Sequence, residues 1–189
     1  MIWCDLDGTL AYAVPLPPMS RRAIAPFVDF TVGREGFRAA IRPGALDFLH
    51  ALRAITDVRL LTFSRREYAE EMCQRLSLGF TAREIVAQSD WWGGFLNPQP
   101  LRRESKVAAI DVLVANQTDA MNEAKIGWLG SKARLVVVPD FVGANGDSFG
   151  AEWKRYVDKV LTALNDGPRP GAYSHQSSPF RNSLRSPGS

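Results

Sequence analysis

Short apolar runs alternate with segments of helical periodicity through the first 164 residues, and this alternation constrains the fold more than any other feature. The apolar runs predict strands, at residues 2–4, 58–62, 111–114 and 135–138. Segments with apolar residues every three or four positions predict helices, at residues 43–55, 65–76, 118–129 and 151–164. Strands that alternate with helices form a mostly parallel sheet that is covered on both faces. We therefore predict an α/β fold with three layers and a Rossmann-like parallel sheet.

Two further apolar runs, at residues 27–31 and 37–41, flank a turn segment that contains Gly33 and Gly36. This pattern is typical of a β-hairpin. The hairpin and one helix fill the interval between the first and second predicted strands of the sheet, and the interval from Thr62 to residue 106 shows no separate cap. We therefore expect a small β-hairpin insert and no large cap domain.

The last 25 residues differ in composition from the rest of the 189-residue chain. Glycine, proline and serine make up 13 of residues 165–189, which show almost no apolar periodicity, so we predict a disordered tail. Three arginines against one aspartate make this tail basic and account for +2 of the formal net charge of +3. Residues 1–164 form the predicted domain, and their near neutrality does not argue for a nucleic-acid-binding surface.

The sequence also bears on the cellular compartment. No apolar run approaches the roughly 18 residues of a membrane span, and the residues before Asp5 contain no basic region of a secretory signal. The two cysteines, Cys4 and Cys73, cannot form a disulfide framework and lack the spacing of a zinc site. We therefore expect a cytoplasmic protein without a membrane partner.

The segment Asp5-Leu6-Asp7-Gly8-Thr9 directly follows the first predicted strand, and parallel sheets bind ligands at the carboxyl ends of their strands. Gly8 permits a sharp turn, within which the hydroxyl of Thr9 can hydrogen-bond. Such a turn brings two carboxylates into one site, where a hard cation such as Mg²⁺ balances their charge. One ionised aspartate can attack phosphorus, and a second carboxyl group can protonate the leaving oxygen.

The segment 2–10 resembles motif I of the haloacid dehalogenase superfamily, whose members transfer phosphoryl groups through an aspartate nucleophile. The layout of residues 1–164 is similar to the branch that contains phosphatases of the RNA polymerase II C-terminal domain (the NIF/FCP type). Gly8 departs from that branch, which typically carries an acid at this position. The features that carry the similarity after the hairpin are Arg42-Pro43-Gly44, Phe48-Leu49, Leu60-Leu61-Thr62 and Tyr68-Ala69.

The resemblance implies a role for each polar residue of the first motif. Asp5 would be the nucleophile, and Asp7 would be the acid/base that also offers its backbone carbonyl to Mg²⁺. Gly8 and Thr9 would complete the turn that receives the phosphoryl group.

The resemblance also implies partners downstream of the first motif. Thr62 matches motif II, whose hydroxyl binds the transferred phosphoryl group, and Ser64 is a second candidate on the same turn. Both precede a predicted helix, whose free N–H groups favour an anion. Lys106 matches motif III, where an ammonium group offsets the charge of the phosphoryl group, and Arg102 and Arg103 are nearby competitors for this role.

Motif IV departs from the pattern, because Ala115 stands where the superfamily carries a metal-binding aspartate. A methyl group cannot ligate a metal. Asn116 still offers a carboxamide oxygen and Asp119 lies one helical turn further on, so the candidate Mg²⁺ ligands are Asp5, Asp7, Asn116 and Asp119. Three interpretations remain open: Asp119 substitutes through a shifted register, the enzyme is weak, or this copy is inactive.

Two functional hypotheses follow from the resemblance. The first is a Mg²⁺-dependent phosphatase that forms an aspartyl-phosphate and acts on a phosphorylated macromolecule, either a phosphoprotein or a nucleic-acid end, because uncapped sites admit large substrates. The alternative is a catalytically impaired relative that binds a phosphorylated partner, as the Ala115 departure suggests. The sequence does not specify the oligomeric state.

Overall fold

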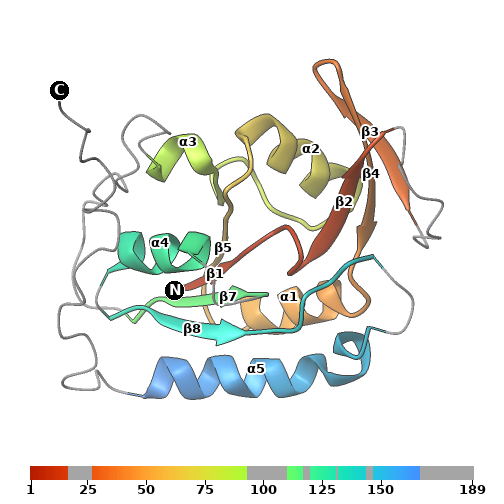
Figure 1. The fold of residues 1–189 in the computed structure, drawn as a ribbon. Helices are drawn as coiled ribbons and strands as arrows, with labels where there is room; N and C mark the ends of the chain where they lie inside the picture. The colour runs from red at the N-terminus through yellow and green to blue at the C-terminus, as the bar shows by residue number, and fades with distance from the viewer. Residues whose placement is uncertain (17–26, 93–109, 117–119, 131, 144–146, 167–189) are drawn as a thin grey trace, which may run out of the picture.

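A computed structural model describes residues 1–16, 27–92, 110–116, 120–130, 132–143 and 147–166. Its centre is a parallel five-stranded sheet (Figure 1), whose strands are β1 (Ile2–Cys4), β5 (Val58–Leu61), β6 (Ile85–Val86), β7 (Val112–Ala115) and β8 (Arg134–Val137). The strand order is β6-β5-β1-β7-β8, so β1 lies in the middle. All three residues of β1 are buried, as expected of a central strand covered on both faces.

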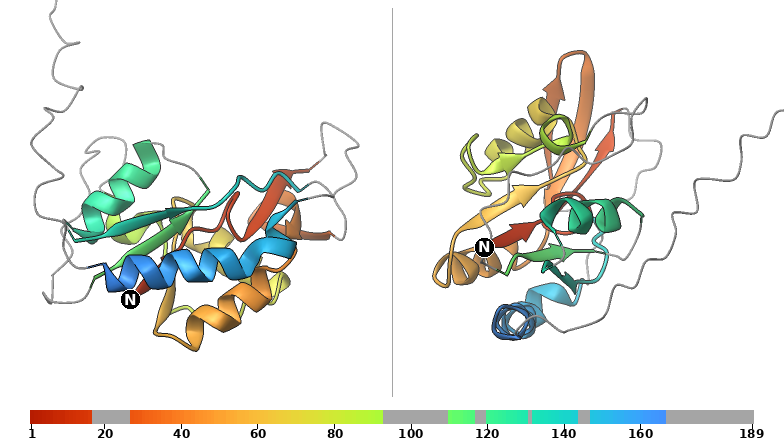
Figure 2. Two further views of the ribbon diagram at one scale, coloured as in Figure 1. Left: turned by 90° about the horizontal axis from the view of Figure 1, so that it is seen from below. Right: turned by 90° about the vertical axis from the view of Figure 1, so that its left-hand side faces the viewer.

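Helices cover both faces of the sheet, which confirms the predicted three layers. On one face α1 (Ala45–Arg53) and α5 (Phe149–Asn165) lie side by side (Figures 1 and 2), and α2 (Arg66–Arg75) contributes to the same apolar cluster. On the other face α3 (Gln88–Trp91) and α4 (Ala120–Leu129) pack against a second cluster.

The alternation of side chains along β1 divides the core between these two clusters. Ile2 and Cys4 belong to the cluster with α1 and α5, and Trp3 between them belongs to the cluster with α3 and α4. Burial also raises the pKa of the Cys4 thiol to about 12, so this cysteine is an unreactive core residue.

A second, antiparallel sheet stands beside the main one (Figure 2). Its strands are β2 (Ala11–Pro15), β3 (Val28–Val32) and β4 (Glu35–Ile41), in the order β2-β4-β3. The predicted hairpin is present as β3 and β4, and Gly33, with φ +61°, provides the left-handed turn residue between them. This sheet has one strand more than the predicted hairpin, because β2 pairs with β4 along its whole length.

The other predicted elements are confirmed to within a few residues, and the missed ones are short. β6 and α3 have only two and four residues, too few to show a periodicity. Within the described part of the chain, none of the helices is both long and apolar enough to span a membrane. The predicted tail lies, from residue 167 onward, outside the described residues.

Candidate active site

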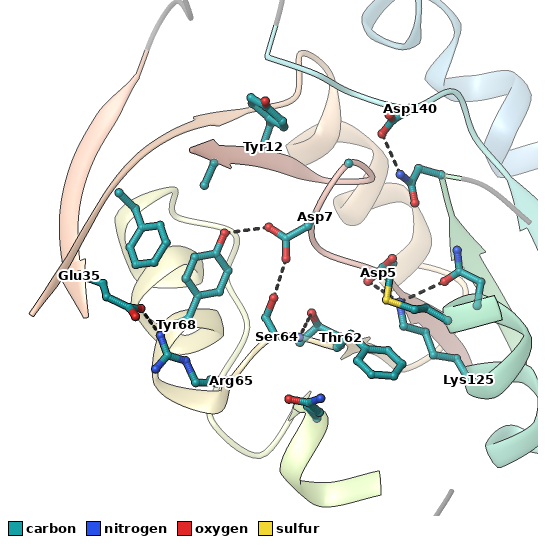
Figure 3. A pocket seen from close by; sticks show the side chains of 18 residues that line it. Asp5, Asp7, Tyr12, Glu35, Thr62, Ser64, Arg65, Tyr68, Lys125 and Asp140 are labelled. Carbon is teal, nitrogen blue, oxygen red and sulfur yellow. Dashed lines mark hydrogen bonds and ion pairs between the residues drawn. The ribbon is translucent and has the colours of Figure 1, made fainter. Parts of the chain in front are cut away.

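The carboxyl ends of β1, β5 and β7 open into a cavity of about 750 Å³, which the second sheet and α4 border. Asp5, Asp7 and Gly8 enter it after β1, Thr62 and Ser64 after β5, and Asn116 and Lys125 after β7 (the lining residues are drawn in Figure 3). These positions match the rule that parallel sheets bind ligands at this edge.

The turn after β1 brings both aspartates to the cavity, as predicted. Gly8 adopts a left-handed φ of +72°, and its N–H donates to the carbonyl of Ala11 at 2.8 Å. A residue with a Cβ is strained at this φ, so the position requires glycine. Thr9 is buried and does not line the cavity, and its hydroxyl has no hydrogen-bond partner among the described residues.

The turn is fixed in place by Arg42, the first residue of the Arg-Pro-Gly segment. Its fully buried guanidinium group donates to the carbonyl of Thr9 at 3.0 Å and pairs with both carboxylate oxygens of Asp147, at 2.6 and 3.0 Å. Phe141 donates its backbone N–H to the carbonyl of Gly8 at 2.8 Å. The peptide groups after the two aspartates are therefore held from two sides.

Asp5 is held at the cavity by a backbone hydrogen bond and an ion pair. Its Oδ1 accepts the N–H of Leu6 at 2.9 Å and lies 2.7 Å from Nζ of Lys125, and both side chains of this ion pair are at least nine-tenths buried. Lys125 also donates to Oδ1 of Asn122 at 3.1 Å, one helical turn earlier in α4. A cation thus faces the predicted nucleophile from inside the protein.

Lys125 was missed by the sequence analysis, which named Lys106 for this role. Lys106 lies outside the described residues, as do its competitors Arg102 and Arg103. The sequence held only a partial signal for Lys125, because Asn122, Lys125 and Leu129 follow a helical spacing, whereas their burial is seen only in the structure. Polar residues on the buried face of a helix need a polar partner, and the partner of Lys125 is Asp5.

Asp7 accepts two hydrogen bonds, one at each carboxylate oxygen (Figure 3). Ser64 Oγ donates to Oδ2 at 2.7 Å, and the hydroxyl of Tyr68 donates to Oδ1 at 2.8 Å. Burial raises the pKa of Asp7, and the negative charge of Asp5 adds to this, whereas the two hydrogen bonds and the charge of Lys125 lower it. The net effect is a raised pKa, which favours a protonated carboxyl group that can act as an acid.

This network predicts a pH effect for Tyr68→Phe. The tyrosine hydroxyl stabilises the ionised form of Asp7, so its removal raises the pKa of Asp7 further. If Asp7 acts as the general acid, kcat/KM for an aryl phosphate falls at the pH where Asp7 ionises, which gives the pH profile an alkaline limb. This limb is expected to move to higher pH in the variant. The pH profile of kcat/KM measures the shift, with Tyr156→Phe, in the α5 core, as the control. A limb that stays in place would contradict the role of Asp7.

Thr62 and Ser64 occupy the turn between β5 and α2. The hydroxyl oxygen of Thr62 accepts the backbone N–H of Ser64 at 3.1 Å, which leaves its proton for a phosphoryl oxygen in the cavity. Ser64 lies at the cavity as predicted, and its hydroxyl is engaged with Asp7. Thr62 can therefore donate a hydrogen bond to a phosphoryl group, whereas the hydroxyl proton of Ser64 is already used in the bond to Asp7.

Ala115 lies at the edge where motif IV was expected. The pairing of Cys4 with Val114 makes Ala115 the neighbour of Asp5, and its methyl group is fully buried in the apolar cluster that contains Trp3. Asn116 reaches the cavity, and Asp119 lies outside the described residues.

Asp140 is a cavity carboxylate that the sequence analysis missed. It follows β8, lines the cavity and accepts a hydrogen bond from Nδ2 of Asn116 at 2.7 Å. Its signal was an acid two residues after the predicted strand 135–138. Within the described residues, no three side chains of His, Cys, Asp or Glu converge closely enough to hold a metal ion by themselves.

The oxygen donors of the cavity nevertheless suit Mg²⁺ in kind. They include the carboxylate of Asp5 and the carboxamide of Asn116, and the resemblance implies the backbone carbonyl of Asp7 as a further donor. Mg²⁺ prefers oxygen ligands and is commonly bound by one or two carboxylates together with waters and substrate phosphate. A set without three converging acids is therefore compatible with this ion.

The aspartate pair after the central strand and the threonine after the neighbouring strand lie at one cavity, as the resemblance to the haloacid dehalogenase superfamily implies. The chain belongs to the NLI interacting factor-like phosphatase family, whose sequence profile matches residues 1–100. No curated protein matches the chain in sequence.

Solved structures of Fcp1 share the fold. One is described as that of an essential RNA polymerase II CTD phosphatase; it is 16% identical, with a TM-score of 0.54, over 86% of this chain and 48% of that chain. Another is a fission yeast Fcp1 variant bound to beryllium fluoride, 16% identical with a TM-score of 0.52, over 85% of this chain and 50% of that chain. The chain thus spans about half the length of these solved chains.

Proposed function

We propose that this protein is a Mg²⁺-dependent phosphatase that forms an aspartyl-phosphate on Asp5 and acts on phosphoproteins. The observation that carries the proposal is the placement of Asp5 at 2.7 Å from the buried ammonium group of Lys125, in the cavity that also holds Asp7. Membership of a phosphatase family supports the same conclusion.

The side chains of the cavity suit a displacement in two steps. A carboxylate oxygen of Asp5 attacks phosphorus while the bond from phosphorus to the leaving oxygen breaks, and the carboxyl proton of Asp7 goes to that oxygen. Water then attacks the phosphorus, Asp7 takes up its proton, and the bond from phosphorus to Asp5 breaks to release phosphate. Lys125 and the hydroxyl of Thr62 stabilise the negative charge of the transferred group.

Mg²⁺ would be held by the carboxylate of Asp5, the backbone carbonyl of Asp7 and the carboxamide of Asn116. When bound, it supplies positive charge that offsets the phosphoryl oxygens and the two aspartates.

The rim of the cavity supports a phosphoprotein substrate. Tyr12 and Phe37 from the second sheet line it. Arg65, which also lines it, forms an ion pair with Glu35 (Figure 3). Among the described residues, the rim is aromatic and carries no net positive charge. Such a rim suits a peptide better than a nucleic-acid backbone, whose recognition requires basic side chains. The similarity of the fold to Fcp1, a phosphatase of a protein tail, points the same way.

A panel of substrates tests the proposal directly. We expect Mg²⁺-dependent release of phosphate from serine phosphopeptides, with little change between low and physiological salt. Preferred hydrolysis of a 3′-phosphorylated oligonucleotide, with activity that falls steeply with salt, would instead indicate a nucleic-acid end as substrate. The Asp5→Asn variant provides the background for every substrate.

A second candidate function, binding of a phosphorylated partner without turnover, is favoured by the buried methyl group of Ala115 beside Asp5. It predicts that a phosphopeptide binds and is released unchanged, with or without Mg²⁺. Mg²⁺-dependent turnover in the panel above, absent from the Asp5→Asn variant, would contradict it.

A further inference from the structure

Among the described residues, Ala115 leaves the proposed metal site one carboxylate short. Its neighbour Asp5 already uses Oδ1 to bind Lys125 and the N–H of Leu6, and Asn116 contributes an uncharged amide. A hydrated cation binds more firmly where more negative charge surrounds it. The position of any further carboxylate at this edge of the sheet therefore matters.

The segment after β8 carries such a carboxylate. Val138 donates its N–H to the carbonyl of Ala115 at 2.9 Å, and Phe141 donates its N–H to the carbonyl of Gly8 at 2.8 Å. Asp140 lies between these two bonds, so the backbone on both sides of it is attached to β7 and to the turn after β1.

The side chain of Asp140 is also held at the cavity. Oδ1 accepts from Nδ2 of Asn116 at 2.7 Å, which directs the amide nitrogen towards Asp140 and leaves the amide oxygen on the other side of the group. Both side chains lie against Gly8, where an added Cβ would overlap Asn116 and approach Oδ1 of Asp140 to 2.5 Å. The missing side chain of Gly8 thus makes the space that these two polar groups occupy.

We propose that Asp140, acting with Asn116, supplies the carboxylate for Mg²⁺ that Ala115 lacks. This inference rests on the proposed function, because it assigns a residue to the same site. Asp140 is exposed to solvent, which gives a hydrated ion access to its carboxylate. A carboxylate from the segment after β8 takes the place of one at the end of β7, and Asn116 links the two strand ends.

The test is the affinity for Mg²⁺ alone, measured by titration calorimetry on the full chain without substrate. We expect Asp140→Asn, which keeps the shape of the side chain, to weaken Mg²⁺ binding by about tenfold or more. The matched control is Asp57→Asn, which removes an exposed carboxylate before β5, at the opposite end of the sheet. Mg²⁺ affinity in this control should equal that of the unchanged protein.

The outcomes separate the two proposals. If Asp140→Asn binds Mg²⁺ within threefold of the unchanged protein, and the unchanged protein hydrolyses an aryl phosphate only with Mg²⁺, the role of Asp140 is wrong and the phosphatase proposal stands. If the unchanged protein neither binds Mg²⁺ nor hydrolyses any phosphate ester, both are wrong. A melting curve of Asp140→Asn without Mg²⁺ that matches the unchanged protein shows that weaker binding does not come from misfolding.

Discussion

Asp5→Asn is expected to lower the hydrolysis of an aryl phosphate by at least about 10³-fold while the protein stays folded, because the amide cannot attack phosphorus. Although Lys125 loses its partner charge, the fold should persist, since the amide oxygen can still accept from the N–H of Leu6 and from Lys125. Initial rates with Mg²⁺, together with circular dichroism, measure both effects.

The control for Asp5→Asn is again Asp57→Asn, which changes the net charge equally at the far end of the sheet. It should retain the full rate. Equal hydrolysis by the Asp5 variant and the unchanged protein would remove Asp5 as the nucleophile.

Lys125→Met is expected to reduce both activity and stability. The ammonium group faces the carboxylate that receives the phosphoryl group, and loss of one such stabilising group typically lowers kcat by about 10²–10³-fold. Removal of one partner from a buried ion pair costs about 3–5 kcal/mol, because the other charge stays buried and unpaired. Steady-state kinetics and urea unfolding measure the two effects.

Lys132→Met is the matched control for Lys125→Met, because this lysine is exposed beyond the end of α4. It should change neither quantity appreciably. An active, fully stable Lys125→Met variant would show that the ion pair with Asp5 plays no part in the reaction.

The parts of the site that could be predicted from sequence are those that local chain geometry brings together. Asp5, Asp7 and Gly8 belong to a single turn, and Thr62 directly follows the neighbouring strand β5, so strand ends alone locate them. The substitution at Ala115 was also visible, because it breaks a pattern at a strand end.

The parts that could not be predicted depend on packing between distant elements. Lys125 reaches Asp5 because α4 turns its polar residues towards the sheet, and the helix pattern alone does not say which lysine meets which acid. Asp140 meets Asn116 only because β8 pairs with β7 in one particular register. β2 likewise is recognised as a strand only through its pairing with β4.

The most direct test of the proposed reaction is chemical trapping of the intermediate. Borohydride reduces an acyl phosphate to an alcohol, so an aspartate that carries a phosphoryl group becomes homoserine, which peptide mass spectrometry detects. With an aryl phosphate and Mg²⁺ present, we expect homoserine at position 5, and none when either is left out. Turnover of the substrate without homoserine at position 5 would contradict the assignment of Asp5 as the residue that receives the phosphoryl group.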